Sequence, residues 1–174
     1  GISGFSMGGY SSLMIAMKHP DLFSCVLSLS PGLMRNQDLK GAVDEDWDDT
    51  FKEAYGAAFS PNLKLEKPYG NIPQFDGSKS DNQVVQDWEN GFGNIDVKIK
   101  NYLSLNKPLA GIKLVVGSND SYEWIRNGCA EFAKQMKAKN HPIELEITDG
   151  DHEIPYDYHG VKFASYFSKY LEDS

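Results

Sequence analysis

The chain has 174 residues, of which 40% are hydrophobic and 12% aromatic, and this composition is typical of a globular protein and not of a disordered chain. Its formal net charge of −8 argues against nucleic acids and anionic membrane surfaces as partners. No apolar run approaches the ~20 residues that a membrane-spanning helix needs.

The first predicted elements alternate between helix and strand. Residues 8–19 predict a helix with a broad apolar surface, and Pro20 ends it. Residues 25–29 predict a buried strand that ends just before Pro31. Because a buried strand directly after a helix is typical of a βαβ unit, we predict the α/β class with a mostly parallel sheet.

The middle of the chain, about residues 33–107, has a different character. An amphipathic helix is predicted at 44–59, an irregular loop at 60–82, a short helical stretch near 84–88 and a further helix at 95–104. The first of these helices is indicated by aromatic residues that recur every four positions, Trp47, Phe51, Tyr55 and Phe59. We interpret the tract as an insertion that forms a lid or cap, with ordinary packing helices as the alternative.

The last third of the chain returns to alternating strands and helices. Strands are predicted at 112–116 and 143–147, and helices at 121–139 and 156–172. The expected apolar anchors of the last helix are Val161, Phe163, Phe167, Tyr170 and Leu171.

The stretch "GFSMG" at residues 4–8 is a complete G-x-S-x-G motif and makes Ser6 the candidate nucleophile. A serine hydroxyl is a weak nucleophile until a neighbouring base takes its proton. We expect Gly4 and Gly8 to let a strand and a helix approach closely around the turn, and Gly9 to extend this freedom. The backbone N–H of Met7 is the expected donor to an oxyanion.

Four histidines compete for the role of the general base. His152 is the first choice, because it follows the last predicted strand, where open α/β sheets place their sites. His159 is the second choice, since seven residues further on it can still reach the same edge of the sheet. His19 at a helix end and His141 in a turn have simpler explanations.

The acid that orients the base is expected to come between Ser6 and His152 in the chain. Asp120 is the first choice because it follows the strand 112–116, and Glu123 is the second choice. Asp149 and Asp151 flank His152, but residues adjacent in the chain usually point elsewhere. Capping of a helix at Ser121 is the alternative explanation of Asp120.

Neither a metal nor a cofactor is expected. No CxxC or HExxH spacing occurs, so a structural zinc site is not predicted. The two cysteines, Cys25 and Cys129, do not form a disulfide framework, and Cys25 lies in an apolar run that suggests a small buried side chain.

Three stretches, "GFSMGGYSSLMIAMKHPDLFSCVLSLSPG", "GSNDSYEW" and "DGDHEIPYDYH", resemble the esterase D / feruloyl esterase group of α/β-hydrolases. The resemblance covers about residues 1–32 and 109–172. It implies a three-layer α/β/α fold and a carboxylesterase that forms an acyl-enzyme on Ser6, with His152 as base and Asp120 as its partner. The group also contains S-formylglutathione hydrolases, carbohydrate acetyl and feruloyl esterases, and mycolyl transferases.

The sequence departs from this group in two respects. The 114-residue separation between Ser6 and Asp120 is long, and the middle tract accounts for it. The group's earlier strands, and the loop that supplies a second oxyanion donor, have no counterpart, and only about three strands are expected, with Ile2 and Ser3 ending another. We therefore interpret residues 1–174 as the C-terminal part of a larger hydrolase domain, whose sheet an N-terminal segment or a second chain completes.

Three functions fit these observations. The first is a serine carboxylesterase for small acyl esters, such as carbohydrate-linked acetyl or feruloyl esters. The second is an acyltransferase of the mycolyltransferase-like type, and the third is a catalytically inactive binding module with the hydrolase fold. Five aromatic residues are candidates either for a substrate pocket or for the core, namely Trp47, Trp88, Tyr122, Trp124 and Tyr156.

Overall fold

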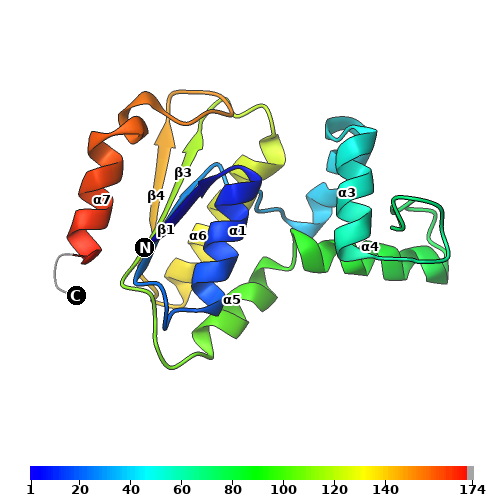
Figure 1. Ribbon diagram of the computed structural model, residues 1–174, viewed down its shortest axis with the longest axis horizontal. Helices are drawn as coiled ribbons and strands as arrows, with labels where there is room; N and C mark the ends of the chain where they lie inside the picture. The colour runs from blue at the N-terminus through cyan, green and yellow to red at the C-terminus, as the bar shows by residue number, and fades with distance from the viewer. Residues whose placement is uncertain (172–174) are drawn as a thin grey trace. The chain divides into compact units, whose positions relative to one another are not determined.

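The computed structural model describes residues 1–171 and contains a four-stranded parallel sheet (Figure 1). The strands lie side by side in chain order, as β1 (Ile2–Phe5), β2 (Cys25–Leu29), β3 (Gly111–Gly117) and β4 (Glu144–Thr148). All three strand pairs are parallel, so the carboxyl ends of the four strands lie along one edge of the sheet. The predicted α/β class and mostly parallel sheet are confirmed.

Besides the three strands that were expected, the sheet contains the strand predicted to end at Ile2 and Ser3, and this strand continues to Phe5. The residues Ile2–Phe5 form a full strand, and each of them pairs with a residue of β2, from Ile2 with Val26 to Phe5 with Leu29. A four-residue stretch that contains two polar or small residues has no apolar pattern of its own. It becomes a strand because the backbone of β2 supplies its hydrogen bonds.

Helices cover both faces of the sheet and complete the expected three layers (Figure 1). They are α1 (Met7–Lys18), α5 (Ile95–Leu103), α6 (Glu123–Ala138), the short η3 (Tyr156–His159) and α7 (Val161–Leu171). The helices α1, α5 and α6 lie on one face, and α7 lies on the other (Figure 1). None of the helices in residues 1–171 combines the length and the apolar character that crossing a bilayer requires.

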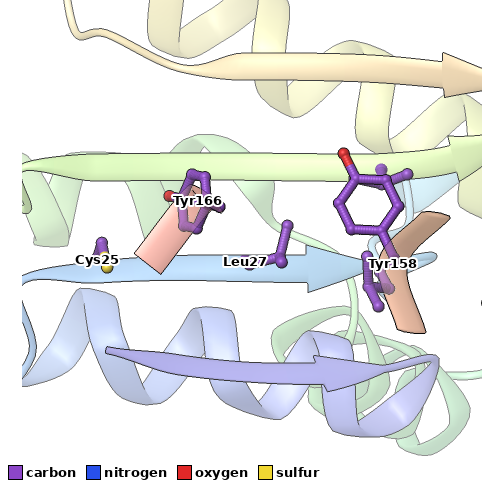
Figure 2. Close-up of a cluster of buried hydrophobic side chains, with 6 residues drawn as sticks. Cys25, Leu27, Tyr158 and Tyr166 are labelled. Atoms are coloured by element: carbon purple, nitrogen blue, oxygen red, sulfur yellow. The ribbon is translucent and has the colours of Figure 1, made fainter. Parts of the chain in front are cut away.

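The strand β2 is buried on both faces, and successive residues contact different layers. Cys25 and Leu27 belong to the cluster on the α7 side, together with Tyr158 and Tyr166 (Figure 2). On the opposite side, the hydroxyl of Ser28 donates a hydrogen bond of 2.6 Å to a backbone oxygen of α1. This two-sided burial explains why the strand is an almost continuous apolar run.

The C-terminal helix differs from the expectation. The predicted helix at 156–172 is divided at Gly160 into η3 and α7 within the described residues. Two of the expected anchors, Phe167 and Tyr170, pack against the buried cluster, whereas Val161 is 81% exposed. Phe163 and Leu171 are also exposed, and Tyr166 is the buried residue of α7.

Residues Met34–Asn94 form a second compact unit. It contains η1 (Asn36–Asp38), α2 (Leu39–Gly41), η2 (Ala42–Asp46), α3 (Asp49–Phe59) and α4 (Lys79–Gly91). Its core is aromatic, with ring contacts among Trp47, Tyr55, Phe59, Trp88 and Phe92.

The boundaries of this unit are narrower than the predicted insertion. The helix α5 packs on α6 and belongs to the unit that contains the sheet. The helix α4 is longer than expected at its start, because the hydroxyl of Ser78 accepts a hydrogen bond from the backbone N–H of Asp81 and caps the helix at Lys79. A lid function for residues 34–94 stays a prediction.

Candidate active site

Ser6 lies on the sharp turn between β1 and α1, with a left-handed backbone (φ 54°, ψ −120°). Its N–H donates to the carbonyl oxygen of Leu29 at 2.9 Å, and its own carbonyl oxygen accepts from the N–H of Tyr10 at 3.0 Å. Such a backbone conformation costs of order 1–3 kcal/mol in a residue with a side chain, and these hydrogen bonds hold it. The turn therefore presents the hydroxyl of Ser6 at the carboxyl edge of the sheet.

Close packing around the turn depends on Gly4 and Gly9 rather than on Gly4 and Gly8. A methyl group at Gly4 would collide with the backbone carbonyl of Gly8, and one at Gly9 would lie 2.7 Å from the carbonyl oxygen of Leu29. At Gly8 a methyl group would meet no heavy atom within 4 Å. The expected role of Gly8 is therefore wrong, because its own Cα hydrogens face open space.

Alanine substitutions at Gly8 and Gly9 are expected to change the stability of the protein by different amounts. We expect Gly9→Ala to lower the free energy of unfolding by about 1–3 kcal/mol, because backbone atoms leave no room for the methyl group. Gly8→Ala is expected to be neutral, or to stabilise α1 by up to about 1 kcal/mol, because alanine favours the helix. Urea denaturation of both variants measures the difference, and equal destabilisation would contradict the assignment.

The side chains of Ser6, His152 and Asp120 form a hydrogen-bonded row. The Nε2 atom of His152 lies 2.9 Å from the Oγ of Ser6, and its Nδ1 atom lies 2.9 Å from Oδ2 of Asp120. A proton on Nδ1 satisfies both contacts, since Nδ1–H then donates to the carboxylate and Nε2 accepts from the hydroxyl. The three residues meet because β1, β3 and β4 all end at the same edge of the sheet.

The carboxylate of Asp120 is fully buried, and both of its oxygens have partners. While Oδ2 contacts the imidazole, Oδ1 accepts the backbone N–H of Tyr122 at 3.0 Å. The alternative of a helix cap at Ser121 is wrong in its position, because α6 begins only at Glu123. The hydrogen bond to Tyr122 instead forms a local turn that aims the other oxygen at His152.

The competing residues lie elsewhere. Glu123 is exposed in the first turn of α6, and Asp120 rather than Glu123 contacts the imidazole. His159 is exposed in η3. His141 contacts the hydroxyl of Tyr102 at 3.2 Å, and His19 ends α1.

Two aromatic rings pack against the imidazole of His152. The ring of Phe5 lies 4.9 Å from it and is tilted by 39°, and the ring of Tyr122 lies at the same distance, edge-on at 86°. Phe5 was not expected at the site, although it is the variable residue before the serine in the G-x-S-x-G motif. Of the other aromatic candidates, Trp47, Trp88 and Trp124 are buried and Tyr156 is 90% exposed.

The loops after β3 and β4 are tied together by hydrogen bonds. The N–H of Ser118 donates to the carbonyl of Thr148 at 2.8 Å, and the N–H of Asn119 donates to the carbonyl of Gly150 at 2.9 Å. Further along, one carboxylate oxygen of Asp151 accepts backbone N–H groups from both loops. These contacts hold the acid-bearing loop beside the histidine-bearing loop.

A charged network fixes the segments on both sides of the histidine-bearing loop. Glu146 of β4 accepts hydrogen bonds from the ammonium groups of Lys113 and Lys162, both at 2.8 Å, and from the hydroxyl of Tyr158 at 2.6 Å. Partial burial raises the pKa of the Glu146 carboxyl, but the three donors outweigh this effect and lower the pKa to about 2. The network therefore joins β4 to η3 and α7.

This network is expected to make stability depend on pH in the acid range. The folded pKa of Glu146 lies below its ordinary value of 4.5, so its contribution is present at neutral pH and is lost as the pH falls from about 4.5 towards 2. We expect Glu146→Gln to destabilise the protein at pH 7 and to differ little from wild type near pH 2. Urea midpoints across this range measure the difference, with Glu131→Gln as a control on α6. A wild-type advantage that is the same at both pH values would contradict the assignment.

No metal site is visible in the part of the chain that the structure describes. Within residues 1–171, no three His, Cys, Asp or Glu side chains are grouped in a way that could hold an ion. Cys25 and Cys129 are both buried free thiols. The arrangement of the row Ser6, His152 and Asp120 is suited to nucleophilic chemistry that uses only protein groups.

A sequence profile described as "Putative esterase", that of the Esterase family, matches residues 1–170. The chain belongs to the Esterase family. No curated relative matches the chain. The family match confirms the predicted resemblance to esterases.

Solved structures share the fold of this esterase family member. An S-formylglutathione hydrolase (FrmB) from Staphylococcus aureus is 18% identical, with a TM-score of 0.56 over 95% of this chain and 52% of its own. The fluorophosphonate-binding serine hydrolase FphF of the same organism is 21% identical, with a TM-score of 0.53 over 95% and 52%. The capsule O-acetyltransferase of Neisseria meningitidis serogroup A is 15% identical, with a TM-score of 0.55 over 98% and 55%. The chain thus spans about half the length of these structures, which are similar in fold.

Proposed function

We propose that the protein is a serine carboxylesterase that hydrolyses small acyl esters through an acyl-enzyme intermediate on Ser6. The observation that carries the proposal is the continuous row of hydrogen bonds from the hydroxyl of Ser6 through His152 to Asp120. Membership of the Esterase family supports the same reaction.

In the first half of the proposed reaction, Nε2 of His152 takes the proton of Ser6 as Oγ attacks the carbonyl carbon of the ester. The buried carboxylate of Asp120 stabilises the imidazolium that forms. The imidazolium then gives its proton to the departing alcohol, and the acyl group remains on Oγ. In the second half, His152 takes a proton from water as the water oxygen attacks the acyl carbon. The bond between the acyl carbon and Oγ then breaks, the imidazolium returns the proton to Oγ, and the carboxylic acid is released.

The negative charge on the carbonyl oxygen needs donors that are already in place. We propose the backbone N–H of Met7 as one of them, because Met7 follows Ser6 directly and is the first residue of α1. The positive end of the dipole of α1 supports negative charge at the same place.

Short acyl chains are the substrates that we propose to test first. Two proteins with the same fold, an S-formylglutathione hydrolase and a capsule O-acetyltransferase, are named for formyl and acetyl groups. Acetyl esters of carbohydrates are therefore suitable first substrates beside p-nitrophenyl acetate, and feruloyl esters test the longer alternative.

Covalent labelling tests the proposal. We expect a fluorophosphonate probe to label the full-length protein once, and mass spectrometry of the digested protein to locate the label on Ser6. Absence of a label on Ser6 would favour a binding module without activity. With an added sugar alcohol, acyl transfer that outruns hydrolysis would favour the acyltransferase over the esterase.

A further inference from the structure

We infer that Asp151 is a positioning residue that holds His152 against Asp120 by joining the loops that carry them. Its effect on catalysis rests on the proposed function, whereas its effect on the geometry of His152 does not. Asp151 does not contact Ser6 or the imidazole ring through any described hydrogen bond. It acts through the backbone on either side of the site.

The geometry centres on a single atom, Oδ1 of Asp151. This oxygen accepts the backbone N–H of Ser121 at 2.7 Å and the backbone N–H of His152 at 2.7 Å. Ser121 directly follows Asp120, so the same atom is bonded to the neighbour of the acid and to the backbone of the base. The two residues of the contact between Ser121 and Asp151 are 30 positions apart in the chain. The contact thereby holds the loop that follows β3 against the loop that follows β4.

The position of this contact distinguishes it from the others between the two loops. The contacts of Ser118 with Thr148 and of Asn119 with Gly150 lie closer to the ends of the strands. The contact of Asp151 lies furthest from the strands and directly beside both Asp120 and His152. Its loss would free the part of the loop on which the imidazole depends, while the inner contacts still hold the fold.

The carboxylate of Asp151 serves as an acceptor and not as an alternative acid of the row. Its two backbone donors, first His152 and then Ser121, lower the pKa of this exposed carboxyl, so it is ionised at neutral pH. Hydrogen bonds to an ionised acceptor are shorter and stronger than neutral ones. The Nδ1 atom of His152 meanwhile contacts Asp120, which leaves the two carboxylates with separate tasks.

The test compares Asp151→Ala, Asp151→Asn and the control Asp149→Ala in the full-length protein. We expect Asp151→Ala to lower kcat for p-nitrophenyl acetate about tenfold with KM unchanged, because a small displacement of a catalytic group slows the chemical step. Asp151→Asn retains an Oδ1 acceptor and should restore kcat to within about threefold of wild type. Asp149 is exposed and lies on the other side of Gly150, so Asp149→Ala should match wild type.

A proton NMR measurement gives a readout that does not depend on turnover. The Nδ1–H proton of His152, hydrogen-bonded to Asp120, should give a downfield signal in wild type and in Asp151→Asn that is lost in Asp151→Ala. The inference is overturned if wild type lacks this signal or if Asp151→Ala keeps it. Two kinetic results would also overturn it, namely an unchanged kcat in Asp151→Ala or a kcat of Asp151→Asn as low as that of Asp151→Ala. A Tm of Asp151→Ala that falls together with its kcat would overturn it as well, because the loss would then be one of stability. If wild type shows no turnover that depends on Ser6, the proposed function fails and the NMR signal alone decides about Asp151.

Discussion

Ser6→Ala is expected to lower kcat/KM for p-nitrophenyl acetate by about 10⁶-fold. The substitution removes the oxygen that lies 2.9 Å from Nε2 of His152 and leaves the backbone bonds to Leu29 and Tyr10 in place. The fold should therefore persist, and the loss should appear in the chemical step. Initial rates and circular dichroism of wild type and variant measure both quantities.

Ser3→Ala is the matched control for this prediction. Ser3 lies in β1, the strand that precedes Ser6, and its hydroxyl donates to the carbonyl of Leu27 at 2.7 Å. We expect Ser3→Ala to lower stability by about 1 kcal/mol, the usual net contribution of one hydrogen bond, and to leave kcat unchanged. Retention of more than a few per cent of activity by Ser6→Ala would mean that another residue is the nucleophile.

Asp120→Asn is expected to lower kcat by about 10⁴-fold, the loss that the corresponding substitution causes in a serine protease. The amide has the shape of the carboxylate, so the buried site can stay filled and Oδ1 can still accept from Tyr122. If the amide N–H₂ faces Nδ1, however, the proton of the imidazole must move to Nε2. The nitrogen next to Ser6 then donates a proton when it should accept one, and the nucleophile is no longer activated.

Glu123→Gln is the control that separates the two acids considered for this role. Glu123 is exposed in the first turn of α6, and we expect its variant to keep kcat to within about twofold. Measuring kcat for Glu123→Gln and Asp120→Asn at one pH decides which of the two acids orients His152. A large loss in Glu123→Gln together with a small loss in Asp120→Asn would reverse the assignment.

Much of the candidate site follows from the order of elements in the sequence. The strand predicted at 25–29 has the same bounds in the structure, because an apolar run buried on both faces leaves little freedom in its ends. Polar residues that follow successive parallel strands meet at one edge of the sheet. For that reason the sequence predicts Ser6, Asp120 and His152, and the structure brings the side chains of Ser6 and Asp120 within hydrogen-bond distance of His152.

The second unit was harder to predict because local patterns there compete with distant contacts. The loop was expected to extend over residues 60–82, but α4 already begins at Lys79. The buried carboxylate of Asp81 explains this earlier start of the helix. Its two oxygens accept backbone N–H groups from Gln74 and Asp76, which fold the preceding loop back onto the helix. An aspartate in a polar stretch carries no sequence signal for such a contact.

The sequence by itself determined the α/β class, the nucleophile motif and the order of the three candidate residues, because burial patterns and strand ends are local properties. Only the tertiary structure decided that Gly9 rather than Gly8 is tightly packed, that Phe5 packs on His152, and that Asp151 joins two loops. Each of these depends on the distance between backbones from different elements. A sequence pattern specifies which face a residue occupies, but the neighbours it meets there are set by how the elements pack together.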